Sequence, residues 1–212
     1  MDASKPWVLA TRNAGKLREL RALFGERGIS VVDLADAGVA EDECAESAIE
    51  AYDTFEENAL AKARHFSTLL PGHTVVADDS GLAVDALGGL PGVRSKRWSV
   101  DAGAVSGAGS VDANNNALLV RSLRGITERR ARFVCAAACA GGETEQVVRG
   151  EVVGSIVEAP RGNHGFGYDP HFLVDELGMT LAEATIAEKA RVSHRARAFE
   201  ALLVRIASLG TE

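Results

Sequence analysis

Two long, mostly apolar segments near the middle of the chain constrain the fold most strongly. Residues 131–140 and 145–156 follow one another, and Gly141-Gly142 lies in the short connection between them. Paired glycines between two apolar runs are typical of a β-hairpin, so the pattern predicts two long antiparallel strands. Earlier in the chain, short apolar runs alternate with segments of helical periodicity, which indicates strands separated by helices. Together these patterns predict an α/β fold with a long mixed β-sheet flanked by helices.

The remaining elements are predicted from periodicity and from turn residues. Residues 101–116 are rich in Gly, Ala, Ser and Asn and are expected to form a mobile loop, and a Gly/Pro-rich loop is expected over residues 160–170. Without an internal repeat or a clear linker, residues 1–212 are expected to form one domain. Strands are expected at 7–10, 29–34 and 74–77, and helices at 16–26, 54–70, 116–123, 180–189 and 193–209.

Charge and length limit the partners. The chain has 212 residues and a formal net charge of −7. An acidic protein is poorly suited to bind a nucleic acid polymer or a membrane surface, although a small anion at a locally basic site is compatible with this charge. The N-terminus lacks an apolar run long enough for a signal peptide, so a cytoplasmic protein is expected.

The three cysteines, Cys44, Cys135 and Cys139, do not follow a zinc-binding spacing. Cys135 and Cys139 lie in one apolar run, where two positions this far apart on a strand are too distant for a disulfide. We therefore expect both to be small buried side chains.

Two predicted helices begin with cations, where the helix dipole disfavours positive charge. The first is entered through Thr11-Arg-Asn-Ala-Gly-Lys16, which places Lys16 and Arg18 in its first turn. The second has Ser193 as its expected N-cap, followed by His194 and Arg195. An anionic ligand would relieve this conflict, because helix N-termini bind phosphate. The alternative for the first helix is an ordinary turn with a solvated lysine.

Several carboxylates are candidates for binding Mg²⁺. Asp78 and Asp79 follow a predicted strand, and because adjacent strand residues point to opposite faces, only one should reach a given cleft. The alternative is a turn stabilised by aspartate side chains. In the acidic stretch that follows residue 41, Glu57 matches a capping box with Thr54, so Glu50 is the freer metal candidate. Lys62 could reach the same cleft or be solvated.

The loop over residues 160–170 carries two aromatic residues between glycines. Phe166 and Tyr168 could stack on a base, and Asp169 could accept hydrogen bonds from ring N–H groups. The alternative is a plain hairpin loop.

In chain order these segments resemble the inosine triphosphate pyrophosphatase family, which hydrolyses non-canonical purine nucleoside triphosphates. The resemblance extends from about residue 7 to residue 205. The matching stretches are Val8-Leu-Ala-Thr-Arg-Asn-Ala-Gly-Lys16, Thr54-Phe-Glu-Glu-Asn-Ala-Leu-Ala-Lys62, Ala77-Asp-Asp-Ser-Gly-Leu-Ala-Val-Asp85, Gly88-Gly-Leu-Pro-Gly92, Gly165-Phe-Gly-Tyr-Asp-Pro170, and Glu188-Lys189 followed by Ser193-His-Arg195.

The resemblance implies two lobes around a central nucleotide-binding cleft, a homodimer, and Mg²⁺-dependent release of pyrophosphate from ITP, dITP and XTP. It implies that Asp79 is the proton acceptor and that Asp79 and Glu50 hold the metal. It also implies convergence of the basic residues on one cleft. The implied substrate-binding residues are Thr11, Arg12, Asn13, Ala14, Gly15, Lys16, Lys62, Ser80, Phe166, Gly167, Tyr168, Asp169, Lys189, His194 and Arg195.

The chain departs from the family pattern at Arg12, where glycine is common, and in the basic stretch at residues 92–98. A carboxylate bound to Mg²⁺ is a weak base, so we expect Asp79 to act first as a metal ligand. Selectivity should depend on the 6-oxo group of hypoxanthine and xanthine. Guanine shares that group, so exclusion of GTP requires a further contact near the purine 2-position. The alternatives are a pyrophosphatase for modified pyrimidine or methylated nucleotides, and a catalytically silent nucleotide sensor.

Overall fold

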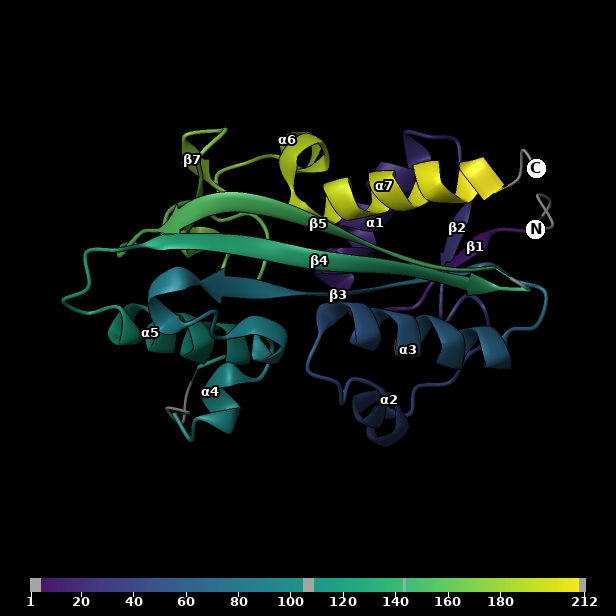
Figure 1. The fold of residues 1–212 in the computed structure, drawn as a ribbon, viewed down its shortest axis with the longest axis horizontal. Helices are drawn as coiled ribbons and strands as arrows, with labels where there is room; N and C mark the ends of the chain where they lie inside the picture. The colour runs from purple at the N-terminus through teal and green to yellow at the C-terminus, as the bar shows by residue number, and fades with distance from the viewer. Residues whose placement is uncertain (1–4, 105–108, 143, 210–212) are drawn as a thin grey trace. The chain divides into compact units, whose positions relative to one another are not determined.

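The computed structural model describes residues 5–104, 109–142 and 144–209. The described residues form a seven-stranded mixed sheet in the order β2-β1-β3-β4-β5-β6-β7, with helices on its faces (Figure 1). The strands are β1 (Trp7–Leu9), β2 (Val31–Asp33), β3 (Val75–Val84), β4 (Arg130–Gly141), β5 (Thr144–Ile156), β6 (Phe172–Val174) and β7 (Met179–Thr180). The helices are α1 (Ala14–Gly25), α2 (Glu43–Ile49), α3 (Phe55–Leu69), α4 (Trp98–Asp101), α5 (Val111–Ser122), α6 (Ile186–Val192) and α7 (His194–Leu209).

Both strand directions occur in this sheet. β1 pairs in parallel with β2 and with β3, whereas β6 pairs antiparallel with β5 and with β7. The two longest strands, β4 and β5, are neighbours and follow each other directly in the chain, as the apolar runs around Gly141-Gly142 predict. The predicted fold class, α/β with a mixed sheet, is confirmed. None of the described helices combines the length and the apolar character that a bilayer crossing needs.

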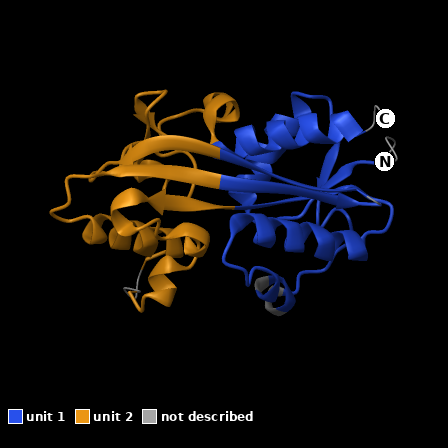
Figure 2. Ribbon diagram, in the orientation of Figure 1, with its two compact units in different colours: residues 1–79, 135–150, 194–212 blue, residues 80–134, 151–193 orange. Residues whose placement is uncertain are grey.

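The chain divides into two compact units, shown in blue and orange in Figure 2. Unit 1 comprises residues 1–79, 135–150 and 194–212, and unit 2 comprises residues 80–134 and 151–193. The chain passes from one unit to the other within β3, within β4, within β5 and again between α6 and α7. The expectation of a single domain over residues 1–212 stays a prediction.

The core of unit 1 packs α1 and α7 against the sheet. Phe24 and Phe199 are fully buried, and their ring centroids lie 5.7 Å apart in an edge-to-face arrangement. Cys135 and Cys139 are buried free thiols in the same core, as expected, and burial raises the pKa of Cys139 to about 12. Burying side chains of this size contributes about 1.5–3 kcal/mol each, so this core anchors α1 and α7 against the strands.

Unit 2 has its own core. Phe133 and Phe172 pack edge to face with ring centroids 4.7 Å apart. Leu119 of α5 and Tyr168, which lies in the segment between β5 and β6, belong to the same buried cluster. Helix α5 and the loop at residues 160–170 are therefore parts of one packed body.

Four local predictions are wrong. β3 continues to Val84 and does not end before Asp78, because the polar residues at its centre find buried partners in the folded protein. The acidic residues between the predicted strand at 29–34 and the predicted helix at 54–70 are expected to form a loop, but a short helix, α2, occupies part of this segment, and its N-cap Asp42 accepts a hydrogen bond from Ala45 N. Helix α5 begins at Val111, because Ser110 caps it. Thr180 ends β7, and α6 begins at Ile186 after a Thr185–Glu188 capping box. Residues 105–108 of the expected mobile loop lie outside the described residues.

Gly150 on β5 allows α7 to pack closely against the sheet. A Cβ atom at this position would lie 2.3 Å from Ala198 N and 2.5 Å from His194 O, both backbone atoms of α7. We expect Gly150→Ala to lower the free energy of unfolding by about 2 kcal/mol, because the helix would have to move away from the strand. Urea unfolding measures this change.

The matched control is Gly25→Ala at the end of α1, where a Cβ would meet no atom within 4 Å. We expect this variant to stay within about 0.5 kcal/mol of the parent protein. Equal unfolding midpoints for the two variants would contradict the close-packing argument.

Candidate active site

Residues 11–16, which connect β1 to α1 and enter its first turn, are called the predicted phosphate loop because phosphate is expected to bind there. Asn13 caps α1, and its Oδ1 accepts a hydrogen bond from Lys16 N at 3.0 Å. Thr11 Oγ1 accepts one from Asn13 N at 3.2 Å. Lys16 is in the first turn as predicted, whereas Arg18 lies beyond it because α1 begins at Ala14. Acidic residues are absent from that turn, so its backbone N–H groups and Lys16 form a locally positive helix start.

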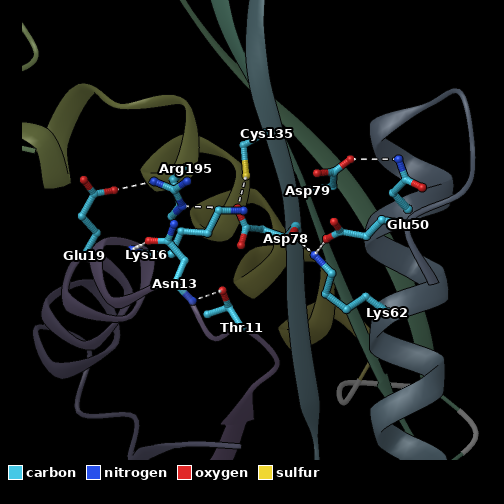
Figure 3. Close-up of polar contacts among 11 residues, drawn as sticks. Thr11, Asn13, Lys16, Glu19, Glu50, Lys62, Asp78, Asp79, Cys135 and Arg195 are labelled. Carbon is cyan, nitrogen blue, oxygen red and sulfur yellow. Dashed lines mark hydrogen bonds and ion pairs between the residues drawn. The ribbon is translucent and has the colours of Figure 1, made fainter. Parts of the chain in front are cut away.

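Asp78 is the buried centre of a charged network in unit 1 (Figure 3). Its Oδ2 lies 3.0 Å from Lys16 Nζ and 3.3 Å from Arg195 Nε. Burial alone would raise the pKa of Asp78, but the charges of Lys16, Arg195 and Lys62 outweigh burial and hold it well below its ordinary value. Arg195 also pairs with Glu19 of α1. The cations at two helix starts therefore share a carboxylate that sequence analysis did not select.

Asp79 points to the opposite face of β3, as strand alternation predicts (Figure 3). It is 8% exposed, and its Oδ2 accepts a hydrogen bond from Asn58 Nδ2 at 3.0 Å. Burial is the main cause that raises the pKa of Asp79 to about 6; Glu50 adds to this rise, whereas Lys16 and Lys62 oppose it. A cation close to this carboxyl would therefore strongly favour its charged form.

Lys62 and Glu50 form an ion pair on the Asp79 side of the strand. Lys62 projects from α3, and its Nζ also donates to the backbone carbonyl of Asp78 at 2.9 Å. Burial would lower the pKa of Lys62, but Glu50, Asp78 and Asp79 together raise it. The expected proximity of Lys62 to the carboxylates is thus found in unit 1.

Asn58 organises this side of the site, and sequence analysis missed it. Its side-chain amide donates to Tyr52 O and accepts from Tyr52 N, at 3.1 Å and 3.0 Å. It thereby holds the segment that follows Glu50, while it also hydrogen-bonds Asp79. The signal that was available was its place in the motif that begins with Thr54, where a buried asparagine needs polar partners.

The donor set around Asp79 fits Mg²⁺ that is shared with a phosphorylated ligand. Among the described residues, no group of three or more His, Cys, Asp or Glu side chains could hold a metal alone. Glu50 and Asp79 lie close enough that Glu50 raises the pKa of Asp79. Mg²⁺ is typically bound by one or two carboxylates, with phosphate oxygens and water as its other ligands, so this pair suits it.

Arg12, within the predicted phosphate loop, contacts the segment before and within α2. Its Nη2 lies 2.8 Å from Glu46 Oε1 and donates to Ala40 O at 3.0 Å and to Val39 O at 3.2 Å. Glu46 is also the main cause that raises the pKa of Arg12. In this structure Arg12 ties residues 39–46 to the loop, and its expected contact with phosphate stays a prediction.

The loop at residues 160–170, which is predicted to contact the base and is called the base loop below, belongs to unit 2. Asp169 is buried, and its Oδ2 accepts hydrogen bonds from Lys189 Nζ at 2.6 Å and from Phe166 N at 3.1 Å. Gly165 has a φ of +84°, and a Cβ there would lie 2.1 Å from Asp169 Oδ2, so only glycine fits. Tyr168 is a core residue whose hydroxyl donates to Ser95 O at 2.9 Å. Phe166 is half-buried, and stacking of either ring on a base stays a prediction.

The predicted residues therefore fall into two groups, one in each unit. Lys16 and Arg195 meet at Asp78, while Lys62 meets Glu50 on the other side of β3, so these cations do not share a single carboxylate. The predicted convergence of all the basic residues on one cleft stays a prediction. Unit 1 also contains Thr11, Arg12, Asn13, Ala14, Gly15, Asp79 and His194, and unit 2 contains Ser80, Phe166, Gly167, Tyr168, Asp169 and Lys189.

The fold and this site define an α/β protein in which buried lysine, arginine and carboxylate side chains gather beside a helix N-terminus, an arrangement suited to an anionic ligand. The chain belongs to the Ham1 family, whose model matches residues 7–205. This match confirms the family relationship that the sequence analysis describes as a resemblance to inosine triphosphate pyrophosphatases.

Relatives with similar sequences span nearly the whole chain. A dITP/XTP pyrophosphatase of Burkholderia pseudomallei is 48% identical over 205 residues, which cover 95% of this chain and 93% of the relative. One from Geobacillus kaustophilus is 47% identical and is covered to 92%, with 93% of this chain aligned. Among solved structures, the Staphylococcus aureus Ham1 protein aligns with a TM-score of 0.76 and 34% identity, covering 96% of this chain and 99% of that one. A dITP/XTP pyrophosphatase from Mycobacterium abscessus aligns with a TM-score of 0.67 and 44% identity, covering 94% and 99%.

Proposed function

We propose that this protein hydrolyses non-canonical purine nucleoside triphosphates, namely ITP, dITP and XTP, to the nucleoside monophosphate and pyrophosphate. The observation that carries the proposal is the cluster around Asp79, in which Glu50, Lys62 and Asn58 surround a buried carboxyl group next to the positively charged start of α1. The near-full-length similarity to dITP/XTP pyrophosphatases supports the same reaction.

The proposed cofactor is Mg²⁺, which Asp79 and Glu50 would hold. Bound there, Mg²⁺ would neutralise negative charge on the phosphate oxygens. Its proposed place is supported by the two carboxylate donors, which suit a hard divalent cation that also binds phosphate oxygens. In the structure the Glu50 carboxylate is paired with Lys62, which places Lys62 beside the proposed metal site.

The proposed reaction is attack of water on the α-phosphorus. The new P–O bond forms to the water oxygen, the bond to the bridging oxygen breaks, and pyrophosphate leaves while one proton is released. Lys16 and Lys62 would stabilise the charge that grows on the phosphate oxygens, which is the dominant contribution in phosphoryl transfer. The backbone N–H groups of residues 11–16 would orient the phosphates.

Base recognition falls, in this proposal, to unit 2. Asp169, held by Lys189, is a carboxylate, and carboxylate oxygens are the acceptors that ring N–H groups of a 6-oxopurine require. Phe166 is the half-buried aromatic residue available for stacking.

We further propose that the protein acts in the cytoplasm as a homodimer. The resemblance to the family supports the dimer, and the location follows from the proposed substrates, which belong to the pool of free nucleotides.

The decisive experiment measures pyrophosphate release from ITP, dITP, XTP, dUTP, ATP and GTP, with Mg²⁺ and with EDTA. We expect rates with ITP, dITP and XTP at least about 100-fold above those with ATP, since a mismatched buried polar group is strongly discriminating. EDTA should abolish the activity. A preference for dUTP would replace the proposal with a pyrimidine-directed enzyme, and absence of release from every nucleotide would indicate a binding protein.

A further inference from the structure

The backbone of Gly167, in the base loop at residues 160–170, is held on both sides by a single turn of α5. Gly167 N donates to Asp112 Oδ2 at 2.9 Å, and Gly167 O accepts from Asn116 Nδ2 at 2.9 Å. Asp112 and Asn116 are four residues apart on α5, a spacing that places both on the same helix face. Both backbone polar groups of Gly167 are therefore fixed by one rigid element.

Gly167 lies between Phe166 and Tyr168, the residues assigned to the base, and has a φ of +61°. The adjoining part of the loop is held by α6, because Asp169 accepts from both Lys189 and Phe166 N. Because Gly167 lies between Phe166 and Asp169, the α5 contacts restrain the backbone that carries both residues.

Asn115, the neighbouring residue on α5, holds a second segment of unit 2. Its Nδ2 donates to Ser95 O at 3.1 Å, and its Oδ1 accepts from Ser99 N at 2.8 Å. Tyr168 of the base loop donates to the same Ser95 carbonyl. Consecutive asparagines on one helix therefore align the base loop with the segment at residues 95–99.

Asparagine at position 116 is expected to destabilise α5 unless its Nδ2 donor is needed. Its Oδ1 atom is buried and has no hydrogen-bond partner among the described residues, and asparagine is a poor helix former. Because Gly167 O is an acceptor, only the amide nitrogen of Asn116 can face it. Places where a sequence breaks local rules tend to be functional.

We propose that Asp112 and Asn116 are positioning residues that set the orientation of the base loop and thereby the purine selectivity of the enzyme, including its discrimination against GTP. The inference rests on the proposed function. Exclusion of GTP requires a further contact near the purine 2-position, and the proposal assigns that contact to a correctly placed base loop. A shift of about 1 Å in a positioned group can cost about 100-fold in rate.

The sharp test is Asn116→Asp, which keeps the side-chain volume but places a carboxylate oxygen against Gly167 O. We expect kcat/KM for XTP to fall by about 10- to 100-fold, mostly through KM, and the XTP-to-GTP selectivity ratio to fall by about tenfold or more. Asp112→Asn retains an acceptor for Gly167 N, so its selectivity ratio should stay within about threefold of the parent protein.

The charge control is Ala117→Asp, which adds a carboxylate to an exposed position of α5 and should leave the ratio unchanged. Selectivity equal to that of the parent protein in Asn116→Asp, whatever its melting temperature, would overturn the proposal. Should Asn116→Asp not fold, Asn116→Ala removes the donor without repulsion and must lower the ratio in the same direction. A parent protein that releases no pyrophosphate from any nucleotide would instead refute the proposed function.

Discussion

Replacing Asp79 by asparagine is expected to lower the turnover number for dITP or XTP by about two to four orders of magnitude, while nucleotide binding stays measurable. The amide has nearly the same volume and can still accept the hydrogen bond from Asn58, so the fold should be retained. What is lost is the negative charge that would hold Mg²⁺ together with Glu50. Pyrophosphate release at saturating nucleotide and calorimetric titration of nucleotide measure the two effects separately.

A matched control for this variant is Asp85→Asn. Asp85 is an exposed carboxylate on the same stretch of chain, and its Oδ1 lies 3.1 Å from Arg132 Nη2. Its removal should leave turnover within about twofold, as expected for a surface ion pair. Near-normal turnover in Asp79→Asn would remove Asp79 from the mechanism.

The same variant separates two roles of Asp79. A metal ligand predicts that the Mg²⁺ concentration for half-maximal rate rises and that excess metal restores part of the activity. A residue that only orients the attacking water predicts a low turnover number with an unchanged metal requirement. Mn²⁺ binding in the absence of nucleotide gives a second readout, which the first role alone should weaken.

The overall fold could be predicted because its signals are local. The glycine pair at the end of β4 and the alternation of short apolar runs with helical periodicity suffice to predict a mixed α/β sheet. The predicted end of β3 was wrong, because the low strand propensity of the residues after Ala77 is outweighed by their tertiary contacts. Asp78 and Asp79 are unfavourable within a strand, yet Lys16, Arg195 and Asn58 provide the buried partners that such residues need.

Helix α5 illustrates the same limit. Its first half contains Asp112 and three consecutive asparagines, Asn114, Asn115 and Asn116, which are typical of loops. Their hydrogen bonds to residues 95–99 and to Gly167 are long-range in sequence. A sequence window therefore predicts a loop where tertiary contacts stabilise a helix.

Part of the candidate site could be predicted from cations that lie at helix N-termini, where the helix dipole disfavours them. Cations at two helix starts predicted an anionic ligand there. The structure pairs Lys16 and Arg195 with Asp78, and a bound phosphate stays a prediction. The sequence could not reveal that Asp78 lies between them, because strand alternation predicts only that Asp78 and Asp79 face opposite sides and not which cations lie on each side. Asn58 was missed for a similar reason, since its partners are a backbone segment and a carboxyl group distant in sequence.

The second large effect concerns stability and is expected from Asp78→Asn. Asp78 is 1% exposed and contacts Lys16 and Arg195. Removing the Asp78 charge leaves the buried cations of Lys16 and Arg195 without their shared carboxylate. Such a loss lowers the free energy of unfolding by about 3–5 kcal/mol. We expect the melting temperature to fall by about 10 °C in a protein of this size. The control, Asp36→Asn, removes an exposed carboxylate 3.4 Å from Arg21 and should change the free energy of unfolding by less than about 0.5 kcal/mol.

This contribution should depend on pH with a defined sign. Burial opposes ionisation of Asp78, but Lys16 and Arg195 lower its pKa in the folded state, whereas the unfolded state has a pKa of about 3.9. The stabilisation is thus fully present above about pH 5 and is lost as the pH falls through and below about 4. Urea unfolding at pH 7, 5 and 3.5 should show the difference between the parent protein and Asp78→Asn shrinking only at the lowest pH.

A double variant keeps the argument testable if Asp78→Asn is too unstable to study. Lys16→Met combined with Asp78→Asn removes one of the cations that the single substitution leaves poorly compensated. The double variant should therefore be more stable than the sum of the single effects predicts, by about 1 kcal/mol or more. Additive effects, or a difference between the parent protein and Asp78→Asn that stays constant from pH 7 to 3.5, would show that Asp78 is not the electrostatic centre of unit 1. The cations at the two helix starts would then need a different source of stabilisation, of which a bound phosphate is the first candidate.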